Sequence, residues 1–507
     1  MTPEPSRRAT FPPMRALAPL AVAVSPLLAA ATIVSGARGA IGNDERGQLA
    51  QIAADRVNDW HSPLMTRAWQ ALIATGLGEG ALFVLAALTY WGAFALIAWA
   101  LVRRGAVIAA LAVPAIGALV LAVLVDSLVT KDALLAAALL LGAGLLLTGG
   151  DTRMRRGAAV LATAAFVVGV LMRHNGAFAL GPLLILAWRP RWIERAGVTI
   201  VVSVLIAALA IPVAGLVNRR VLDAAPAGAI ESLRLFDLAG IAAQEGTTAP
   251  FGPGTRVTMR DVARCYTPVM WDTMAPWGRC PWFSAKAGVP IHDQLELARG
   301  TPPSPASLDA AWRRALLAYP GGYLAHRAEH ANAELLLFVS IKPRNGIGPA
   351  MPDPAPPRES AAKALVRYTA GVVLIPAMFV AIGVVAWIVA LAALRRGNGE
   401  WGSGGGGRGE RWPVRVAAAL AASGLGYAAS FVVVGVATAP RYFAYPAATA
   451  LLAVVLLLAD PGVRRLWRVR RDLAALTLLL PAAVMMVAEA GRLTVTVPQP
   501  LPVQPAS

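Results

Sequence analysis

Residues 41 to 69 read IGNDERGQLAQIAADRVNDWHSPLMTRAW and form a polar stretch between two long apolar runs. The stretch carries four carboxylates and one imidazole, which belong to Asp44, Glu45, Asp55, Asp59 and His61. Since the flanking runs are long enough to cross a bilayer, these side chains are predicted to lie just outside a membrane. Carboxylates held at a bilayer surface beside cationic groups suit general-base chemistry on a lipid-phosphate substrate.

The composition indicates a polytopic membrane protein. Of the 507 residues, 57% are hydrophobic and 15% are charged, and the mean hydropathy is +0.60, whereas a soluble domain is typically about half apolar and about one quarter charged. The net charge of +18 comes from basic clusters at the ends of apolar runs, which fits the positive-inside rule and predicts no nucleic-acid partner. The abundance of Ala, Gly, Val, Leu and Arg is typical of a GC-rich bacterial genome, so we expect the bacterial inner (cytoplasmic) membrane as the location.

The apolar runs predict an all-α fold with about eleven transmembrane helices. The expected spans are 14–36, 79–102, 106–125, 133–149, 157–172, 177–188, 196–217, 365–394, 414–438, 446–459 and 473–490. The sixth is at the lower limit of length for crossing a bilayer. A cleavable signal peptide is the alternative for the first run, although that run is longer than the usual apolar core of a signal peptide.

These spans divide the chain into modules. The expected modules are a cytoplasmic N-terminus at 1–13, an N-terminal membrane module at 14–217 with its external loop at 37–78, a large periplasmic loop at 218–363, a C-terminal membrane module at 364–490 with a Gly-rich cytoplasmic linker at 397–411, and a Pro-rich tail at 491–507. Within the large loop, 305–319 and 322–340 are predicted to be helical. Residues 64 to about 75 are predicted to form an amphipathic helix on the membrane surface, with Arg67 on its polar side.

The polar islands of the sequence all fall on one predicted side of the membrane. With the N-terminus inside, the islands on the outer side are 41–63, 126–132, 173–176, 218–363 and 439–446, whereas the turns on the inner side carry mainly arginine clusters. We therefore take the outer side as the functional face. The only two cysteines, Cys265 and Cys280, lie in the large loop, where an oxidising periplasm would allow a disulfide worth about 3 kcal/mol. Two inert buried thiols are the alternative.

Two pairs of charged residues next to the ends of spans are candidates for a role in catalysis or binding. Asp44 and Glu45 could take a proton from an acceptor hydroxyl, or hold a divalent cation against a phosphate, or simply occupy the solvated first turn of a helix. Lys131 could meet a phosphate oxygen, or it could extend to the interface while Asp132 caps the following helix.

Two further islands supply donors for an anion. Arg173, His174 and Asn175 form a compact cluster of donors, and the planar fork of arginine suits phosphate oxygens. Arg441 could provide a second cation, with Tyr442 donating a hydrogen bond. Anchoring to the membrane interface is the alternative for both islands. The sequence has no zinc-ligand spacing, no Gly-rich nucleotide loop and no nucleophile elbow, so no metal site is assigned.

Together these motifs resemble a known family. Asp44-Glu45 in the first external loop, a surface helix after DWHSPL, KDALL at the start of a span, RHNG at an outer end, a large late loop and RYFAYP near the C-terminus are similar to the C-type (GT-C) membrane glycosyltransferases. The resemblance is closest to the branch that includes protein O-mannosyltransferases and the aminoarabinose transferase of lipid A. It covers roughly 14–220 and 365–460.

The resemblance implies a polyprenyl-phosphate-linked sugar as donor and an inverting transfer on the periplasmic face. It makes Asp44 the base, with Glu45 beside it, and it implies that Lys131, Arg173 and Arg441 hold the lipid phosphate so that it leaves with its charge neutralised. The acceptor could be a glycan, a lipid or a protein.

The chain departs from the family at one point. The family's usual paired prolines after the loop histidine appear here as His61-Ser62-Pro63, and the DWH stretch leaves Asp59 open as an alternative base. Two other classes of protein also compete with the transferase. A flippase or transporter of lipid-linked glycans predicts ionisable residues near the middle of the membrane. An O-antigen-type polymerase or ligase predicts arginines in the large loop, which are present at positions 234, 256, 260, 264 and 279.

Overall fold

The computed structural model describes residues 16–36, 41–123, 128–149, 152–188, 196–289, 291–292, 308–338, 375–396 and 412–494. The predicted N-terminal segment 1–13 and the Gly-rich linker 397–411 lie outside these ranges. The described part of the chain is helical, with two isolated β-bridges and no strand. This confirms the predicted all-α class.

Each predicted span overlaps one helix, and residues 365–374 of the eighth predicted span lie outside the described ranges. The helices are α2 Ala18–Ser35, α5 Ala81–Arg103, α6 Val107–Val123, α7 Lys131–Thr148, α8 Thr152–Met172, α9 Ala177–Trp188, α10 Ala196–Arg220, α18 Pro376–Arg396, α19 Trp412–Val434, α20 Ala444–Ala459 and α22 Arg471–Thr494. Nine of the described helices are long and apolar enough to cross a membrane, which makes the chain a multi-pass helical membrane protein. The last of them, α22, extends to Thr494, beyond residue 490, where its span was predicted to end.

Two of the eleven expected spans are short. The helix α6 has 17 residues and α9 has 12. At about 1.5 Å per residue, α9 is about 18 Å long, well below the thickness of about 30 Å of a hydrocarbon core. It packs against α10 and α19 within the bundle. The turn that precedes α9 can therefore lie deeper than the ends of the full-length spans.

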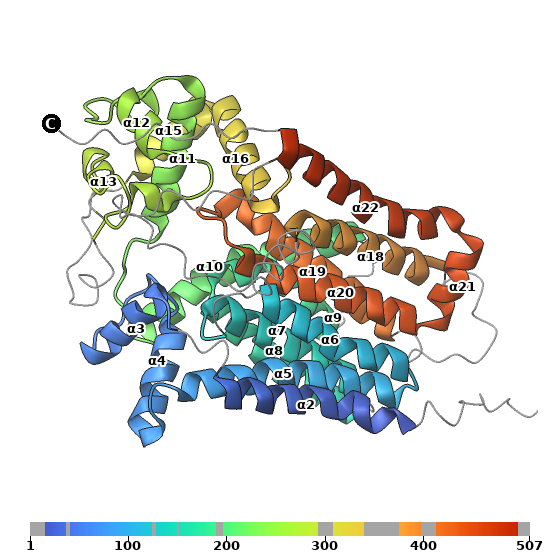
Figure 1. The fold of residues 1–507 in the computed structure, drawn as a ribbon. Helices are drawn as coiled ribbons and strands as arrows, with labels where there is room; N and C mark the ends of the chain where they lie inside the picture. The colour runs from blue at the N-terminus through green and yellow to red at the C-terminus, as the bar shows by residue number, and fades with distance from the viewer. Residues whose placement is uncertain are drawn as a thin grey trace, which may run out of the picture.

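The most buried helix of the bundle is α7, which packs against α5 and α8 (Figure 1). Close contact between α7 and α8 depends on Gly142, because a Cβ added there would lie 2.3 Å from the ring of Phe166. The peripheral helices α10 and α22 expose large apolar side chains such as Leu209 and Leu478. Such an apolar surface suits lipid, since the backbone polar groups of a helix are satisfied internally.

The polar loops gather at one end of the bundle. The helices α3 Asn43–Ala53 and α4 Pro63–Leu72 of the first polar loop lie at the same end as the late-loop helices α11 Ile230–Glu245, α12 Met259–Cys265, α13 Phe283–Lys286, α15 Asp309–Ala318 and α16 Pro320–Leu335 (Figure 1). The basic segment RRLWRVRR lies at the other end, where α21 Pro461–Val469 joins α20 to α22.

The predicted surface helix is α4, followed by a π-helical turn at Ile73–Leu77. Pro63 at its first turn and Ser62 as its N-cap, which accepts a hydrogen bond from the Met65 amide, fix where it begins. Its buried side carries Met65 and Trp69. The opposite side, which includes Ala71, stays at least partly exposed, as a helix lying on a membrane surface requires.

The late loop contains a small hydrophobic core of its own. The helices α15 and α16 correspond to the segments predicted at 305–319 and 322–340, whereas α11 was not predicted. The core includes Phe236, Trp271 and Phe283. Cys265 and Cys280 form a disulfide in the middle of this core, with a Cα–Cα distance of 5.8 Å.

Removal of this disulfide is expected to destabilise the late loop. Because the bond closes a loop of 15 residues, the double variant Cys265→Ser/Cys280→Ser should lose about 3 kcal/mol of stability. Thermal unfolding of the purified protein in detergent would measure the loss. Reductant should lower the midpoint of the wild-type protein and leave the double variant unchanged. Equal midpoints for both proteins without reductant would contradict the expectation.

Two short backbone pairings hold the loops against one another. Near Asn58 the first loop pairs with the chain that follows α10: the Asp59 amide donates to the Ala225 carbonyl at 3.0 Å, and the Ala225 amide donates to Val57 at 2.9 Å. The late loop pairs in turn with the segment before α20, where the Trp271 amide donates to Val436 at 2.7 Å. These pairings bring segments from both halves of the chain to one place.

Candidate functional site

Four islands that are far apart in the sequence supply one group of charged side chains. The group consists of Asp44, Lys131, Asp132, Arg173 and Arg441, and we call it the ion-pair cluster. Each member lies at the end of a helix rather than in its middle: in the first turn of α3, in the first turn of α7, directly after α8 and in the 3-10 turn before α20. All five were candidates from the sequence.

Asp132 is the centre of the ion-pair cluster. Its side chain is only 3% exposed and receives the guanidinium groups of both Arg173 and Arg441. The Arg441 Nε lies 3.4 Å from the Asp132 Oδ2. Thr130 caps α7 by accepting a hydrogen bond from the Ala133 amide at 3.1 Å, which fixes the first turn and with it the position of the carboxylate. Asp132 is therefore not a simple helix cap, because Thr130 has that role.

Asp44 lies on the open side of the cluster. Its side chain is 36% exposed, and its Oδ2 lies 3.6 Å from the Arg441 Nη2. Burial would raise the pKa of Asp44, but the nearby cationic groups, which are His61, Lys131, Arg441 and Arg173 in order of effect, lower it to about 2. Asp44 is therefore ionised at neutral pH and can still accept a hydrogen bond from a ligand.

Lys131 and His61 bring the first polar loop to the start of α7. The Lys131 Nζ lies 3.5 Å from the His61 Nδ1. The next residue, Ser62, donates from its hydroxyl to the Leu171 carbonyl at 3.0 Å, which ties this loop to the end of α8 just before Arg173. His61, which we expect from the sequence to take part in substrate binding, thus lies against a cation of the cluster.

Aromatic rings form one wall beside Arg173. Its guanidinium carbon lies 4.1 Å from the ring centroid of Tyr442 and 5.2 Å from that of Phe431, and the two rings stack at 5.0 Å. Burial lowers the pKa of Arg173, but the charge of Asp132, the interactions with Tyr427 and Tyr442 and the hydrogen bond to Asp132 together raise it above its usual range. The ring of Tyr442 holds Arg173 through a cation–π contact. The hydrogen bond from Tyr442 to a phosphate stays a prediction.

Four other candidates have different surroundings. Asp59 accepts a hydrogen bond from the Ala227 amide at 2.6 Å, so its carboxylate holds the start of the late loop. Glu45 completes the capping box of α3, accepting from the Gly42 amide at 2.9 Å; burial, followed by the charge of Asp44, raises its pKa. The His174 Nε2 lies 3.3 Å from the Asn218 Nδ2, and Asn175 follows in the same 3-10 turn.

Several residues near the cluster were not predicted. Asp272 in the late loop accepts a hydrogen bond from the Trp277 indole at 3.0 Å. Burial raises the pKa of Asp272 and the charge of Asp44 adds to this effect, so the two carboxylates interact electrostatically. Trp60, Trp271 and Trp277 contact one another with ring centroids 5.5 to 5.9 Å apart. The disulfide that brackets residues 266–279 was the one sequence signal for this segment.

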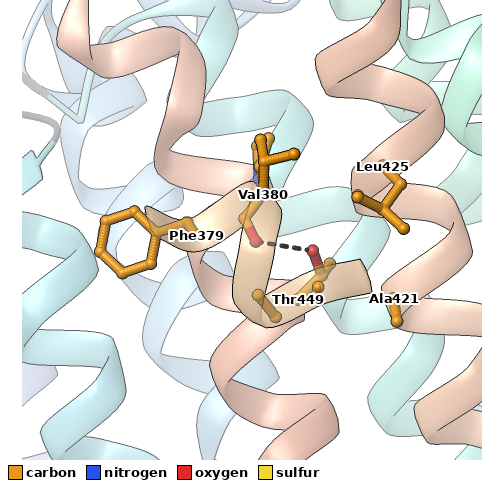
Figure 2. Close-up of a pocket in the computed structure, with 9 residues that line it drawn as sticks. Phe379, Val380, Ala421, Leu425 and Thr449 are labelled. Atoms are coloured by element: carbon orange, nitrogen blue, oxygen red, sulfur yellow. Dashed lines mark hydrogen bonds between the residues drawn. The ribbon is translucent and has the colours of Figure 1, made fainter. Parts of the chain in front are cut away.

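A metal site does not emerge from the residues that the structure describes. Among them, no group of three or more His, Cys, Asp or Glu side chains is placed to hold an ion. The divalent cation considered from the sequence thus has no evident set of ligands there, and we assign it no role. A narrow crevice between α18, α19 and α20, lined by residues such as Phe379, Leu425 and Thr449 (Figure 2), contains no charged side chain and is distinct from the ion-pair cluster.

Comparison of the chain with protein-family models, with curated proteins and with solved structures found no match. The function of the chain is therefore inferred from the geometry of the ion-pair cluster.

Proposed function

We propose that the protein is a glycosyltransferase that moves a sugar from a polyprenyl-phosphate donor to an acceptor of the cell envelope. The proposed location is the periplasmic face of a bacterial cytoplasmic membrane. The observation that carries the proposal is the ion-pair cluster, in which an ionised and accessible carboxylate, Asp44, lies against Arg441 within a group of three cations. Its position at the ends of apolar helices suits a substrate with a charged head and a lipid tail.

The chemistry divides between the two sides of the cluster. Asp44 accepts the proton of the acceptor hydroxyl as its oxygen attacks the anomeric carbon of the sugar. The bond between that carbon and the phosphate oxygen breaks, and the polyprenyl phosphate leaves with the bonding electron pair. Lys131, Arg173 and Arg441 stabilise the negative charge that develops on the phosphate. Attack opposite the leaving group inverts the configuration at the anomeric carbon.

The hydrogen-bond partners of each carboxylate distinguish the base from the carboxylates that have a structural role. Asp44 remains partly exposed, whereas Asp59 is used by the Ala227 amide and Glu45 by the cap of α3. We therefore assign the base to Asp44. Asp132 holds Arg173 and Arg441 in place, and its buried position leaves it no access to an acceptor.

The competing functions receive less support from the geometry. A transport path through the membrane requires ionisable groups near the centres of spans, but the ion-pair cluster lies at helix ends. A polymerase or ligase would use arginines of the late loop, and Arg234 is one of the five candidates there. In the structure Arg234 lies 2.7 Å from Glu231 and 2.6 Å from Asp309, so it joins α11 to α15.

Release of the lipid phosphate tests the proposal directly. Purified protein would be incubated with a panel of polyprenyl-phosphate monosaccharides and cell-envelope extract as the source of acceptor. We expect enzyme-dependent formation of polyprenyl phosphate with at least one donor, together with a product of inverted configuration at the anomeric carbon. A panel that gives no release above the level of heat-treated protein would contradict the proposal.

The variant Arg441→Gln is expected to weaken binding of polyprenyl phosphate by about tenfold to a hundredfold, since a charge-assisted contact is worth roughly 1.5–3 kcal/mol. Titration of the purified protein with the lipid would give the affinity. Arg46→Gln is the matched control, because Arg46 is exposed on α3 close to Asp44 in sequence. Equal losses in both variants would mean that general surface charge, and not the cluster, attracts the lipid.

A further inference from the structure

Glu334 lies in the last turn of α16, a helix of the late loop that packs against α19. Its side chain is 4% exposed, and its Oε1 has no hydrogen-bond partner within the described part of the chain. The carboxyl group interacts electrostatically with Arg173 and Asp132. An ionised carboxylate without hydrogen bonds is costly to bury, so this position favours the protonated form.

The surroundings of Glu334 provide little compensation for a negative charge. The groups that interact with Glu334 are Arg173, Asp132, Tyr427 and Tyr442. The charged and titratable groups on α16 and on the elements packed against it include Glu231, Arg234, Asp237 and Glu245 on α11, Asp309, Arg313 and Arg314 on α15, Arg415 on α19, and Tyr323, His326, Arg327, Glu329 and His330 on α16 itself. Most of them already have partners. Arg327 and Asp237 pair with each other, Asp309 pairs with Arg313, and His330 bonds to the Pro268 carbonyl. Burial raises the pKa of Glu334 well above its usual range, and the charge of Arg173 opposes this effect.

The protonation of Glu334 changes the charge that a ligand meets. Three cations and two carboxylates leave the ion-pair cluster with one net positive charge. An ionised Glu334 would cancel that charge, whereas a protonated Glu334 preserves it. The geometry points to a role in binding: Glu334 carries a proton that the site needs in order to hold the phosphate of its lipid substrate.

This inference rests on the proposed function, because it requires a phosphate in the ion-pair cluster. A bound phosphate would neutralise Arg173, which is the group that favours ionisation of Glu334, and would add a negative charge of its own. Both effects stabilise the proton on Glu334. By linkage, the affinity for the phosphate must then fall as the pH rises above the pKa of Glu334 in the free protein, by up to about tenfold for each pH unit.

The test compares the affinity for polyprenyl phosphate at different pH values in the purified full-length protein. A range of about pH 7.5 to 9.5 is suitable, because the second ionisation of a phosphate monoester, near pH 6, is then complete. We expect the affinity of the wild-type protein to decrease several-fold or more across this range. Glu334→Gln, which is permanently neutral, should hold the affinity nearly constant. Glu329→Gln is the control, since Glu329 is exposed on the same helix, and it should reproduce the wild-type slope.

The outcomes separate this inference from the proposed function. If the wild-type protein binds the lipid and Glu334→Gln has the same pH slope, or if the wild-type affinity is constant with pH, the role of Glu334 is wrong and the proposed function stands. If the wild-type protein binds no polyprenyl phosphate at any pH, both are wrong. A variant that does not fold leaves the wild-type measurement decisive, because proton uptake on binding can be counted with a pH indicator in weak buffer.

Discussion

Asp44→Asn is expected to lower the rate of sugar transfer by about a thousandfold, within the range of 10²–10⁴ that general-base catalysis contributes. The amide keeps the shape of the side chain but cannot take the proton of the acceptor. It also removes one negative charge from the cluster, so the affinity for polyprenyl phosphate should stay equal or increase. Single-turnover transfer and lipid binding, measured on the same preparation, would show this separation of rate from affinity.

Asp55→Asn provides the control for this substitution. Asp55 lies in the same loop with its side chain 81% exposed, and its φ of 48° is one that asparagine accepts readily. Its transfer rate should equal that of the wild-type protein. If Asp44→Asn keeps full activity, Asp44 is not the base and Asp59 becomes the candidate to examine.

The pH dependence of transfer should follow from the low pKa of Asp44. This pKa is lowered from 3.8 to about 2, so the base stays ionised in the folded protein throughout the range above about pH 4. Because the pKa of Asp44 is lower in the folded protein than in the unfolded chain, its ionised form also stabilises the fold. This stabilisation is present above the pKa of the unfolded chain and is lost as the pH falls through the pKa of the folded protein. Loss of activity between pH 5 and 7 would therefore have to come from another group.

Much of the architecture could be predicted because its signals are local. Long apolar runs with arginines at their ends marked the helices, and the alternation of their ends placed the five polar islands on one face. In the structure the helices of the first and late loops lie at one end of the bundle (Figure 1), and Asp44, Asp132, Arg173 and Arg441 from four of the islands form ion pairs with one another. The lengths of the spans were less well predicted, since α9 is an apolar helix that is too short to cross a bilayer by itself. Apolar character by itself does not separate a span from a buried helix.

The sequence predicted many of the residues of the candidate site, but it did not predict how they are arranged. The sequence left Asp132 as either a helix cap or a residue of the substrate site; in the structure Thr130 caps the helix and Asp132 binds two arginines. Glu334 and Asp272 gave no signal, because each approaches the cluster only through the folding of the late loop. Contacts between residues separated by a hundred or more positions have no periodicity that a single sequence could reveal.

Asp132→Asn should be the most destabilising single change in the site. Removing one partner of a buried ion pair costs about 3–5 kcal/mol, because the other charge is left without compensation. Here two guanidinium groups, from Arg173 and Arg441, would lose their shared carboxylate and would then repel each other and Lys131. We expect a fall of several degrees or more in the unfolding midpoint and a large loss of transfer, since the cations can still attract a phosphate but no longer hold it in the position that transfer requires.

An added anion should reverse part of this loss, because a ligand that binds only the folded state stabilises it in proportion to the logarithm of its concentration over its dissociation constant. Polyprenyl phosphate would supply the missing negative charge, so it should raise the midpoint of Asp132→Asn by more than it raises that of the wild-type protein. Arg234→Gln is the comparison, because it breaks an ion pair with Glu231 and Asp309 in the late loop. That variant should be destabilised without any additional response to the lipid. If the lipid raises the unfolding midpoint of Asp132→Asn no more than that of Arg234→Gln, Asp132 does not organise an anion site. A carboxylate that only packs against its neighbours would leave no charge for a phosphate to replace.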